Sequence, residues 1–292
     1  MLLFLSTSGA SAQPIYHHNN FWGRVALSDK IADKWKWEFF LQSRTQNDTA
    51  SKLDIFKHHQ LSSYWLWLHY QAGKDLRISA SPFCYFNSIS LFPQPTELGN
   101  RGVKEFRWAL QAEHTHRFKP VNFLNRLSLE YRLRDLSAPD VYTHNYRIRY
   151  RARLERPIKK EWLQGKQLSL ILYDEVFFEF GEAVKTSPRA FNQNRLYAGF
   201  SYEVVRNVKF NLGYMYLYQQ RPTGALDHSN VLWAIVTFDN LFSQFRRKAP
   251  CDIVITSFEL LASCFESDLN SRLEAHSYSL TGNCLILFPV AA

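Results

Sequence analysis

The chain has 292 residues, a formal net charge of +9 and a mean hydropathy of -0.30. It contains no run of 18 apolar residues, which excludes a membrane-spanning helix. Aromatic residues make up 16% of the chain, and Tyr and Trp in such numbers suit the two interfaces of a membrane. A transmembrane β-barrel is compatible with these values, because alternation along its strands hides the apolar face from a window average.

Residues 1–12 are apolar and then small, and Ala10 and Ala12 form a small-x-small cleavage pattern before Gln13. This pattern is typical of the end of a secretory signal peptide. We therefore expect an exported protein whose mature part begins near Gln13.

From Phe21 onward, eleven segments alternate between apolar and polar residues, which is the period of a β-strand. Each has roughly the 9–11 residues, or a few more, that a tilted membrane strand requires. In the second segment, for example, Trp37 and Phe39 lie on one predicted face, and Glu38 and Arg44 lie on the other. The predicted strands are 21–30, 35–46, 59–71, 75–87, 104–118, 124–136, 143–157, 166–181, 193–204, 207–220 and 229–240.

The connections between these segments alternate in length, as the turns and loops of an outer-membrane barrel do. The linker 158–165 is intermediate and falls where a short turn is expected. Short connections are predicted at 31–34, 72–74, 119–123 and 205–206, and longer ones at 47–58, 88–103, 137–142, 182–192 and 221–228.

These patterns predict an all-β fold: a single antiparallel transmembrane β-barrel of 10–12 strands over residues 13–242. Bacterial barrels nearly always have an even number of strands, so twelve is favoured over the literal count of eleven. Residues 13–20 could supply the missing strand. A soluble β-sandwich is the rival fold, since its strands alternate in the same way.

Residues 243–292 differ in character from the barrel. They hold three of the four cysteines, and the part from 250 has no tryptophan and is acidic. We predict an irregular, poorly packed C-terminal appendage, with a helix or strand over 252–261 or 277–287 outside the barrel.

The most unusual strand is 145–156, in which arginines alternate with tyrosines and aliphatic residues. Inside a barrel, these guanidinium groups could bind phosphate or carboxylate groups of a solute or of lipopolysaccharide. Alternatively, they form a cross-strand ion-pair ladder with glutamates of neighbouring strands, which would help to plug the lumen. The predicted lumen-lining charges are Arg126, Arg132, Arg134, Arg147, Arg149, Arg151, Arg153, Glu130, Glu155, Glu175 and Glu179.

Other reactive side chains give weaker indications. Alternation puts Asp174 on the opposite face from Glu175, which argues against a shared acid–base site. His114 and His116 share a face, a pattern more typical of the interfacial end of a strand than of a metal site, and Ser62 is close to His59 in sequence. No CxxC or Cys/His ligand spacing occurs. The sequence therefore predicts no catalytic residue, metal site or cofactor.

Six short segments have distinctive sequences: 21–28 (FWGRVALS), 33–37 (DKWKW), 39–48 (FFLQSRTQND), 145–150 (NYRIRY), 172–175 (LYDE) and 192–199 (NQNRLYAG). Together they resemble the domain-of-unknown-function 2490 family of outer-membrane barrels from Gram-negative bacteria. This resemblance spans roughly 20–242 and implies a barrel and an exported location, but no activity.

The functional expectation is an outer-membrane, porin-like barrel without identified catalysis, with a lumen lined by arginine and glutamate. Its role would be structural or that of a narrow solute or anion channel. The expected partners are outer-membrane lipid, lipopolysaccharide and a small anionic solute. Nucleic acid is not expected, because the basic residues alternate within strands instead of clustering between aromatic residues. The alternative function is an outer-membrane enzyme that modifies lipid or lipopolysaccharide.

Overall fold

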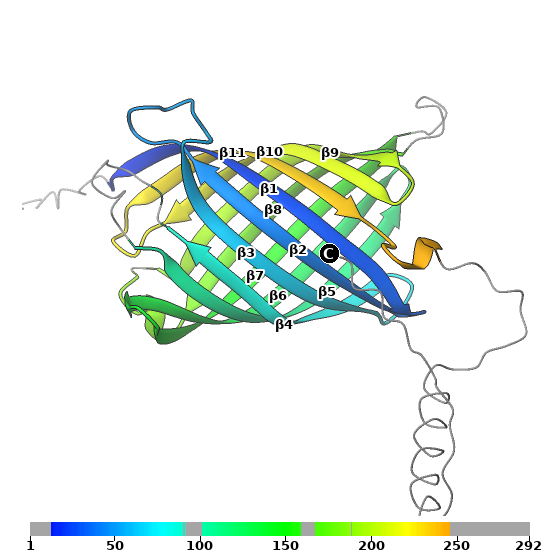
Figure 1. Ribbon diagram of the computed structural model, residues 1–292, viewed down its shortest axis with the longest axis horizontal. Coiled ribbons are helices and arrows are strands. Elements are labelled where there is room, and N and C mark those ends of the chain that lie inside the picture. The colour runs from blue at the N-terminus through cyan, green and yellow to red at the C-terminus, as the bar shows by residue number, and fades with distance from the viewer. Residues whose placement is uncertain (1–12, 90, 92–100, 159–166, 188, 246–292) are drawn as a thin grey trace, which may run out of the picture. The chain divides into compact units, whose positions relative to one another are not determined.

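The computed structural model describes residues 13–89, 91, 101–158, 167–187 and 189–245. These residues form one closed barrel whose strands wrap obliquely around it (Figure 1). Two short 3-10 turns, η3 (Glu182–Val184) and η4 (Ser243–Phe245), accompany the strands. The strands are β1 (Ile15–Ala32), β2 (Trp35–Gln46), β3 (His58–Gln71), β4 (Leu76–Ser88), β5 (Val103–Phe118), β6 (Val121–Ala138), β7 (Val141–Ile158), β8 (Leu168–Phe180), β9 (Phe191–Val205), β10 (Val208–Gln220) and β11 (Leu226–Phe238).

Each strand pairs antiparallel with the next one along the chain, as alternating segments joined by direct connections should. Alternation separates the two faces of each strand. In β8, Tyr173 and Glu175 are buried inside the barrel, whereas Leu172 and Asp174 are exposed outside. The predicted barrel is therefore confirmed. None of the helices in the described part of the chain is long and apolar enough to cross a membrane.

The barrel closes through a parallel pair, in which β1 runs beside β11 from Ile15 opposite Leu226 to Leu27 opposite Phe238. The count of eleven strands lies within the predicted range, one below the favoured twelve. Residues 15–20 extend β1 instead of forming a strand of their own. An odd number of strands makes the first and last point the same way, so the closing pair has to be parallel.

One connection differs from its predicted length. The loop expected at 137–142 is a two-residue turn at Pro139 and Asp140, because β6 and β7 continue their pairing as far as Ala138 and Val141. Asp140 has a positive φ of 61°, which aspartate tolerates better than most residues. We call the end of the barrel with connections 47–57, 89–102 and 181–190 the loop rim, and the opposite end the turn rim.

At the turn rim, two aspartates secure the parallel closure. Asp29 of β1 accepts hydrogen bonds from the backbone N–H groups of Phe242 and Ser243, at 2.6 and 2.8 Å. Residues 243–245 therefore contact the barrel, although the sequence pattern assigned them to the tail. Asp239, just after β11, accepts a hydrogen bond from the Ser28 hydroxyl at 2.7 Å.

Asp239 also lies 2.9 Å from Lys36 Nζ and 3.0 Å from Lys209 Nζ. Burial alone would raise the pKa of its carboxyl group, but the hydrogen bonds from Lys36, Ser28 and Lys209 outweigh burial and lower that pKa well below its ordinary value of 3.8. A lowered pKa means that the folded barrel favours the ionised form. The stabilisation is therefore complete above pH 3.8 and is lost as the pH falls from there through the lowered pKa.

We expect Asp239→Asn to lower the free energy of unfolding by about 2 kcal/mol at pH 7, because charge-assisted hydrogen bonds are lost. The difference from the wild type should shrink below pH 3.8. Urea unfolding in detergent micelles at pH 7 and pH 3 measures both values. Asp33→Asn, at an exposed position in the β1–β2 turn, is the matched control and should have little effect at either pH. A pH-independent loss in Asp239→Asn would contradict the assigned role.

The interior of the barrel contains more apolar side chains than the alternation suggested. The sequence pattern assigned the inward face to polar residues, but two groups of buried, mainly apolar residues also lie there. One group is Trp22, Ile171, Tyr173, Tyr197, Met215, Leu217, Val231 and Trp233; the other is Ala26, Phe40, Leu61, Trp65, Trp67, Cys84, Phe86 and Ala109.

The predicted signal peptide at 1–12 and the predicted elements at 252–261 and 277–287 lie outside the described residues.

Candidate functional site: the charged interior of the barrel

The arginine strand β7 faces glutamates on both neighbouring strands. Glu130 of β6 accepts a hydrogen bond from Arg147 Nε at 2.8 Å and from Arg149 Nη1 at 2.7 Å. Arg107 of β5 adds a third guanidinium group, with Nη1 at 3.4 Å from the same carboxylate. The Glu130 side chain is only 1% exposed, so one fully buried carboxylate compensates part of three positive charges.

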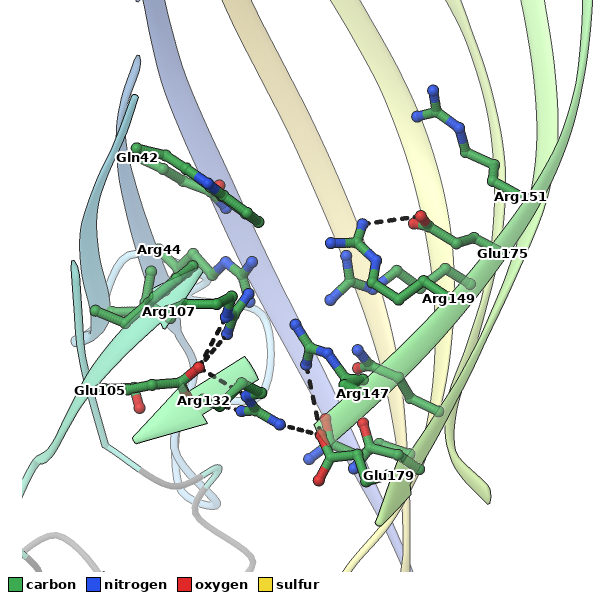
Figure 2. A pocket seen from close by; sticks show the side chains of 18 of the residues that line it. Gln42, Arg44, Glu105, Arg107, Arg132, Arg147, Arg149, Arg151, Glu175 and Glu179 are labelled. Carbon is green, nitrogen blue, oxygen red and sulfur yellow. Dashed lines mark hydrogen bonds and ion pairs between the residues drawn. The ribbon is translucent and has the colours of Figure 1, made fainter. Parts of the chain in front are cut away.

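A second buried centre lies nearer the loop rim. Glu105 of β5 accepts a bidentate pair of hydrogen bonds from Arg132 of β6, both at 2.7 Å, and contacts Arg107 Nε at 2.8 Å. Arg132 reaches across to Glu179 of β8 as well. Figure 2 shows this chain of contacts running from Glu105 through Arg132 to Glu179, with Arg147 also turned toward Glu179. Planar guanidinium groups suit such bridging because their donors point in several fixed directions.

Glu175 of β8 forms the third centre, nearer the turn rim. Its carboxylate lies 2.5 Å from Arg126 Nη2 and 2.8 Å from Arg149 Nη2. Arg151 contacts Glu113 of β5 at 3.4 Å, and Arg77 of β4 contacts the same carboxylate at 2.7 Å.

The remaining predicted charges are more peripheral. Arg153 and Glu155 pair with each other at 2.7 Å, and both are 24% exposed. Arg134 lies 3.8 Å from Glu105 and 4.0 Å from Glu179. Each of the four arginines from Arg147 to Arg153 thus has a carboxylate within 4.0 Å. The wall formed by β5 to β8 carries a cross-strand network of the kind that stabilises strand register.

An elongated cavity of about 380 Å³ lies beside this network. Its lining extends from Leu91 and Gln220 near the loop rim to His69 and Arg77 near the β3–β4 turn. Figure 2 shows Gln42, Arg44 and Arg107 on one side of the cavity, facing Arg147, Arg149 and Arg151 on the other. Twelve arginines line the cavity, against four glutamates. Even when Glu113 and Glu130 are added from the ion pairs, positive charge is in excess.

Several of these residues were not among the predicted site residues. Arg107, Glu105 and Glu113 sit on the polar face of β5, and that alternation was the signal that could have selected them. Arg24, Arg44 and Arg195 line the cavity from β1, β2 and β9. Each is a single arginine in its strand segment, so nothing in the sequence sets it apart from a solvated charge.

The other candidate residues lie on the outside of the barrel. Asp174 is exposed and separated by the wall from buried Glu175 and Glu179. His114 Nδ1 and His116 Nε2 are 3.1 Å apart on the exposed face of β5. No group of three or more potential metal ligands gathers within the described ranges.

Ser62 Oγ and His59 Nε2 lie 3.1 Å apart on the exposed face of β3. The pairing of β2 with β3 shifts between Arg44 and Thr45, because β3 has one extra residue at that point. The shift puts His59 and Ser62, which are three residues apart, on the same face of β3. No carboxylate pairs with His59 in the part of the chain that the structure describes. A serine–histidine pair without an orienting acid is an incomplete arrangement for nucleophilic catalysis.

Comparisons with known proteins identify a family and give no activity. The model of a protein family of unknown function, DUF2490, matches residues 19–229. No curated protein matches the chain. Among solved structures, the beta domain of the Bordetella autotransporter Brka is similar, with 10% sequence identity and a TM-score of 0.42; the match covers 68% of this chain and 81% of that one.

Proposed function

The chain belongs to the DUF2490 family of proteins of unknown function, and we propose that it is an outer-membrane barrel that conducts small anions through a narrow lumen. The excess of arginine over glutamate in the cavity lining carries this proposal. A narrow passage whose lining has an excess of one sign of charge concentrates ions of the opposite sign. Because the lining reaches from the loop rim to near the β3–β4 turn, an anion could follow it along most of the barrel.

The outer surface supports a membrane location. Large apolar side chains remain exposed around the middle of the barrel, among them Leu110, Leu129, Leu172, Leu196 and Leu232. A continuous apolar surface of this kind is unfavourable in water and suits lipid. We propose that outer-membrane lipid and the acyl chains of lipopolysaccharide cover it.

Aromatic pairs lie on the outer face toward both rims. Trp35 packs on Tyr70 at the turn rim, with ring centroids 4.9 Å apart. In the half nearer the loop rim, Tyr131 packs on Tyr146 at 5.4 Å. Aromatic girdles at two levels are typical of barrels that span the outer membrane.

The test is the reversal potential of the folded barrel in a planar bilayer under a tenfold gradient of KCl. We expect the sign that corresponds to chloride selectivity. Arg151→Glu, which places a negative charge in the cavity lining, should reduce or reverse that selectivity. Arg156→Glu is the control on the same strand, since Arg156 is exposed and outside the cavity lining.

A folded barrel that passes no current would overturn the proposed channel. A current that prefers potassium would overturn its selectivity for anions. In the absence of current, the ion-pair network would be a plug and the role structural.

The alternative function, a lipid-modifying enzyme, is favoured by the Ser62–His59 contact alone. Both side chains face the region where lipid would lie. Fatty-acid release from outer-membrane lipid that disappears in Ser62→Ala, while the heat-modifiable gel shift of the folded barrel persists, would establish the enzyme. We expect no such release, because the pair lacks an acid and a defined oxyanion site.

A further inference from the structure

Three arginines in the cavity lining, on β1, β2 and β9, have no described carboxylate within ion-pair distance. Arg24, Arg44 and Arg195 form no ion pair within 4.0 Å with any residue that the structure describes; Arg24 Nη2 donates to the Gln42 side-chain oxygen at 2.9 Å. All three line the cavity. We refer to them as the arginine triad.

Aromatic rings hold the triad in place. Arg44 stacks on Trp22, with Cζ 3.4 Å from the ring centroid, and Arg195 lies over the same residue at 5.1 Å. Arg24 lies 4.0 Å from the centroid of Phe40. A guanidinium group that stacks through its flat face keeps its N–H edge free for a hydrogen-bond acceptor. The rings thus fix the orientation of the cations without using their donors.

Unpartnered N–H groups gather around the triad. The Nε atoms of all three triad arginines are buried without a hydrogen-bond acceptor, and so are the indole nitrogens of Trp22 and Trp233. A buried donor without an acceptor is destabilising, and native proteins rarely leave several together. The Nε atoms of network arginines such as Arg126 and Arg149 also lack an acceptor, but those side chains already bind a carboxylate. The five donors around the triad are therefore the ones that leave a place for an acceptor from solution.

The charge around the triad favours an anionic acceptor. The four charged side chains that act most strongly on Arg44 are arginines: Arg195, Arg24, Arg107 and Arg147. Arg107 and Arg147 form ion pairs with glutamates, whereas Glu175 acts on Arg195 and Glu38 acts on Arg24 only from beyond 4.0 Å. Like charges in a partly desolvated site repel each other strongly unless a counter-ion is present.

We propose that the arginine triad binds a phosphate group. The proposal rests on the proposed function in one respect, because the phosphate must enter the lumen. A tetrahedral oxyanion presents acceptors in several directions and carries up to two charges, which suits three guanidinium groups from three strands. A single carboxylate, being planar, is satisfied by the fork of one arginine.

The first measurement is the titration of inorganic phosphate into the folded, detergent-solubilised barrel by calorimetry, with acetate as the comparison anion. Arg44→Gln with Arg195→Gln should weaken phosphate binding by about a hundredfold, roughly tenfold for each charged contact. Arg153→Gln is the control, because Arg153 pairs with Glu155 and does not line the cavity. Its phosphate affinity should equal that of the wild type.

Stability gives a second readout that needs no current. Phosphate should raise the unfolding midpoint of the wild type and of Arg153→Gln, but not that of the double variant. Without phosphate, the double variant should be at least as stable as the wild type, because two uncompensated charges are removed. If the double variant does not fold, Arg44→Gln alone is titrated.

The phosphate site and the anion channel can be overturned independently of each other. Chloride current without phosphate binding, or equal binding in the double variant and the wild type, would overturn the phosphate site and leave the channel standing. Phosphate binding without current would support the site and overturn the channel. Barrels refolded with and without lipopolysaccharide separate the two sources of phosphate, because a lipid phosphate would occupy the triad before inorganic phosphate is added.

Discussion

Replacing Glu130 with alanine is expected to lower the free energy of unfolding by about 3–5 kcal/mol, the usual cost of removing one partner from a buried ion pair. Glu130 contacts Arg107, Arg147 and Arg149, and its side chain is nearly inaccessible to solvent. Without it, these guanidinium groups keep their charge but lose their shared counter-ion. Urea unfolding of the variant in detergent micelles, followed by the heat-modifiable gel shift, measures the loss.

The matched control is Glu155→Ala. Glu155 also pairs with an arginine of β7, but both side chains are partly exposed. Such pairs contribute about 0–1 kcal/mol. Equal losses in the two variants would contradict the central position of Glu130. The double variant Glu130→Gln, Arg149→Gln should lose less unfolding free energy than the sum of the losses in Glu130→Gln alone and Arg149→Gln alone. The reason is that the double variant removes both members of one pair.

The second large effect is expected where two glycines meet. Gly199 of β9 and Gly213 of β10 lie directly opposite each other, and the Tyr197 ring covers both. A methyl group at Gly213 would meet the Tyr197 ring, with Cε2 at 2.6 Å. At Gly199 it would also meet backbone atoms, namely the Leu212 carbonyl oxygen at 2.6 Å and Gly213 Cα at 2.7 Å. Either substitution by alanine should cost about 1–3 kcal/mol or more through overpacking.

Removal of the Tyr197 ring should change the cost of an added methyl group differently at Gly213 and at Gly199. In a Tyr197→Ala background, Gly213→Ala should cost little more, since Tyr197 supplies its three nearest contacts. Gly199→Ala should remain costly there, because backbone cannot move aside as a side chain can. Gly73→Ala is the control, as an added methyl group at Gly73 has nothing within 4 Å. Equal rescue at both glycines would show that the ring alone sets the constraint.

Local alternation was sufficient to predict most of the barrel. Leu172 and Asp174 outside, and Glu175 inside, follow from a period of two once one face is assigned. The same pattern selected Arg147 and Glu130, whose contact joins neighbouring strands in direct register. These features depend on residues close in sequence or on adjacent hairpin strands.

The remainder depends on contacts between distant parts of the chain. The parallel pairing of β1 with β11 joins residues more than 200 positions apart and leaves no mark on either strand. Trp22 and Trp233 face inward because closure brings their rings together, with centroids 5.5 Å apart. Alternation assigns apolar residues to lipid, so it could not identify these rings. It put Arg44 on the polar face but could not show that Arg44 stacks on Trp22. The arginine triad is therefore a property of the closed barrel.

Because β1 and β11 are parallel, the first and last residues of the barrel lie at opposite rims. β1 starts at the loop rim, where Ile15 lies beside Leu226, whereas β11 finishes at the turn rim with Phe238. In the membrane location that we propose, polypeptide joined to Ile15 and polypeptide joined to Phe238 would depart into different compartments, whichever way the barrel is inserted. A barrel with an even number of strands returns its chain to the rim where it started. Here a domain fused before β1 and a domain fused after β11 would be held on opposite sides of one membrane.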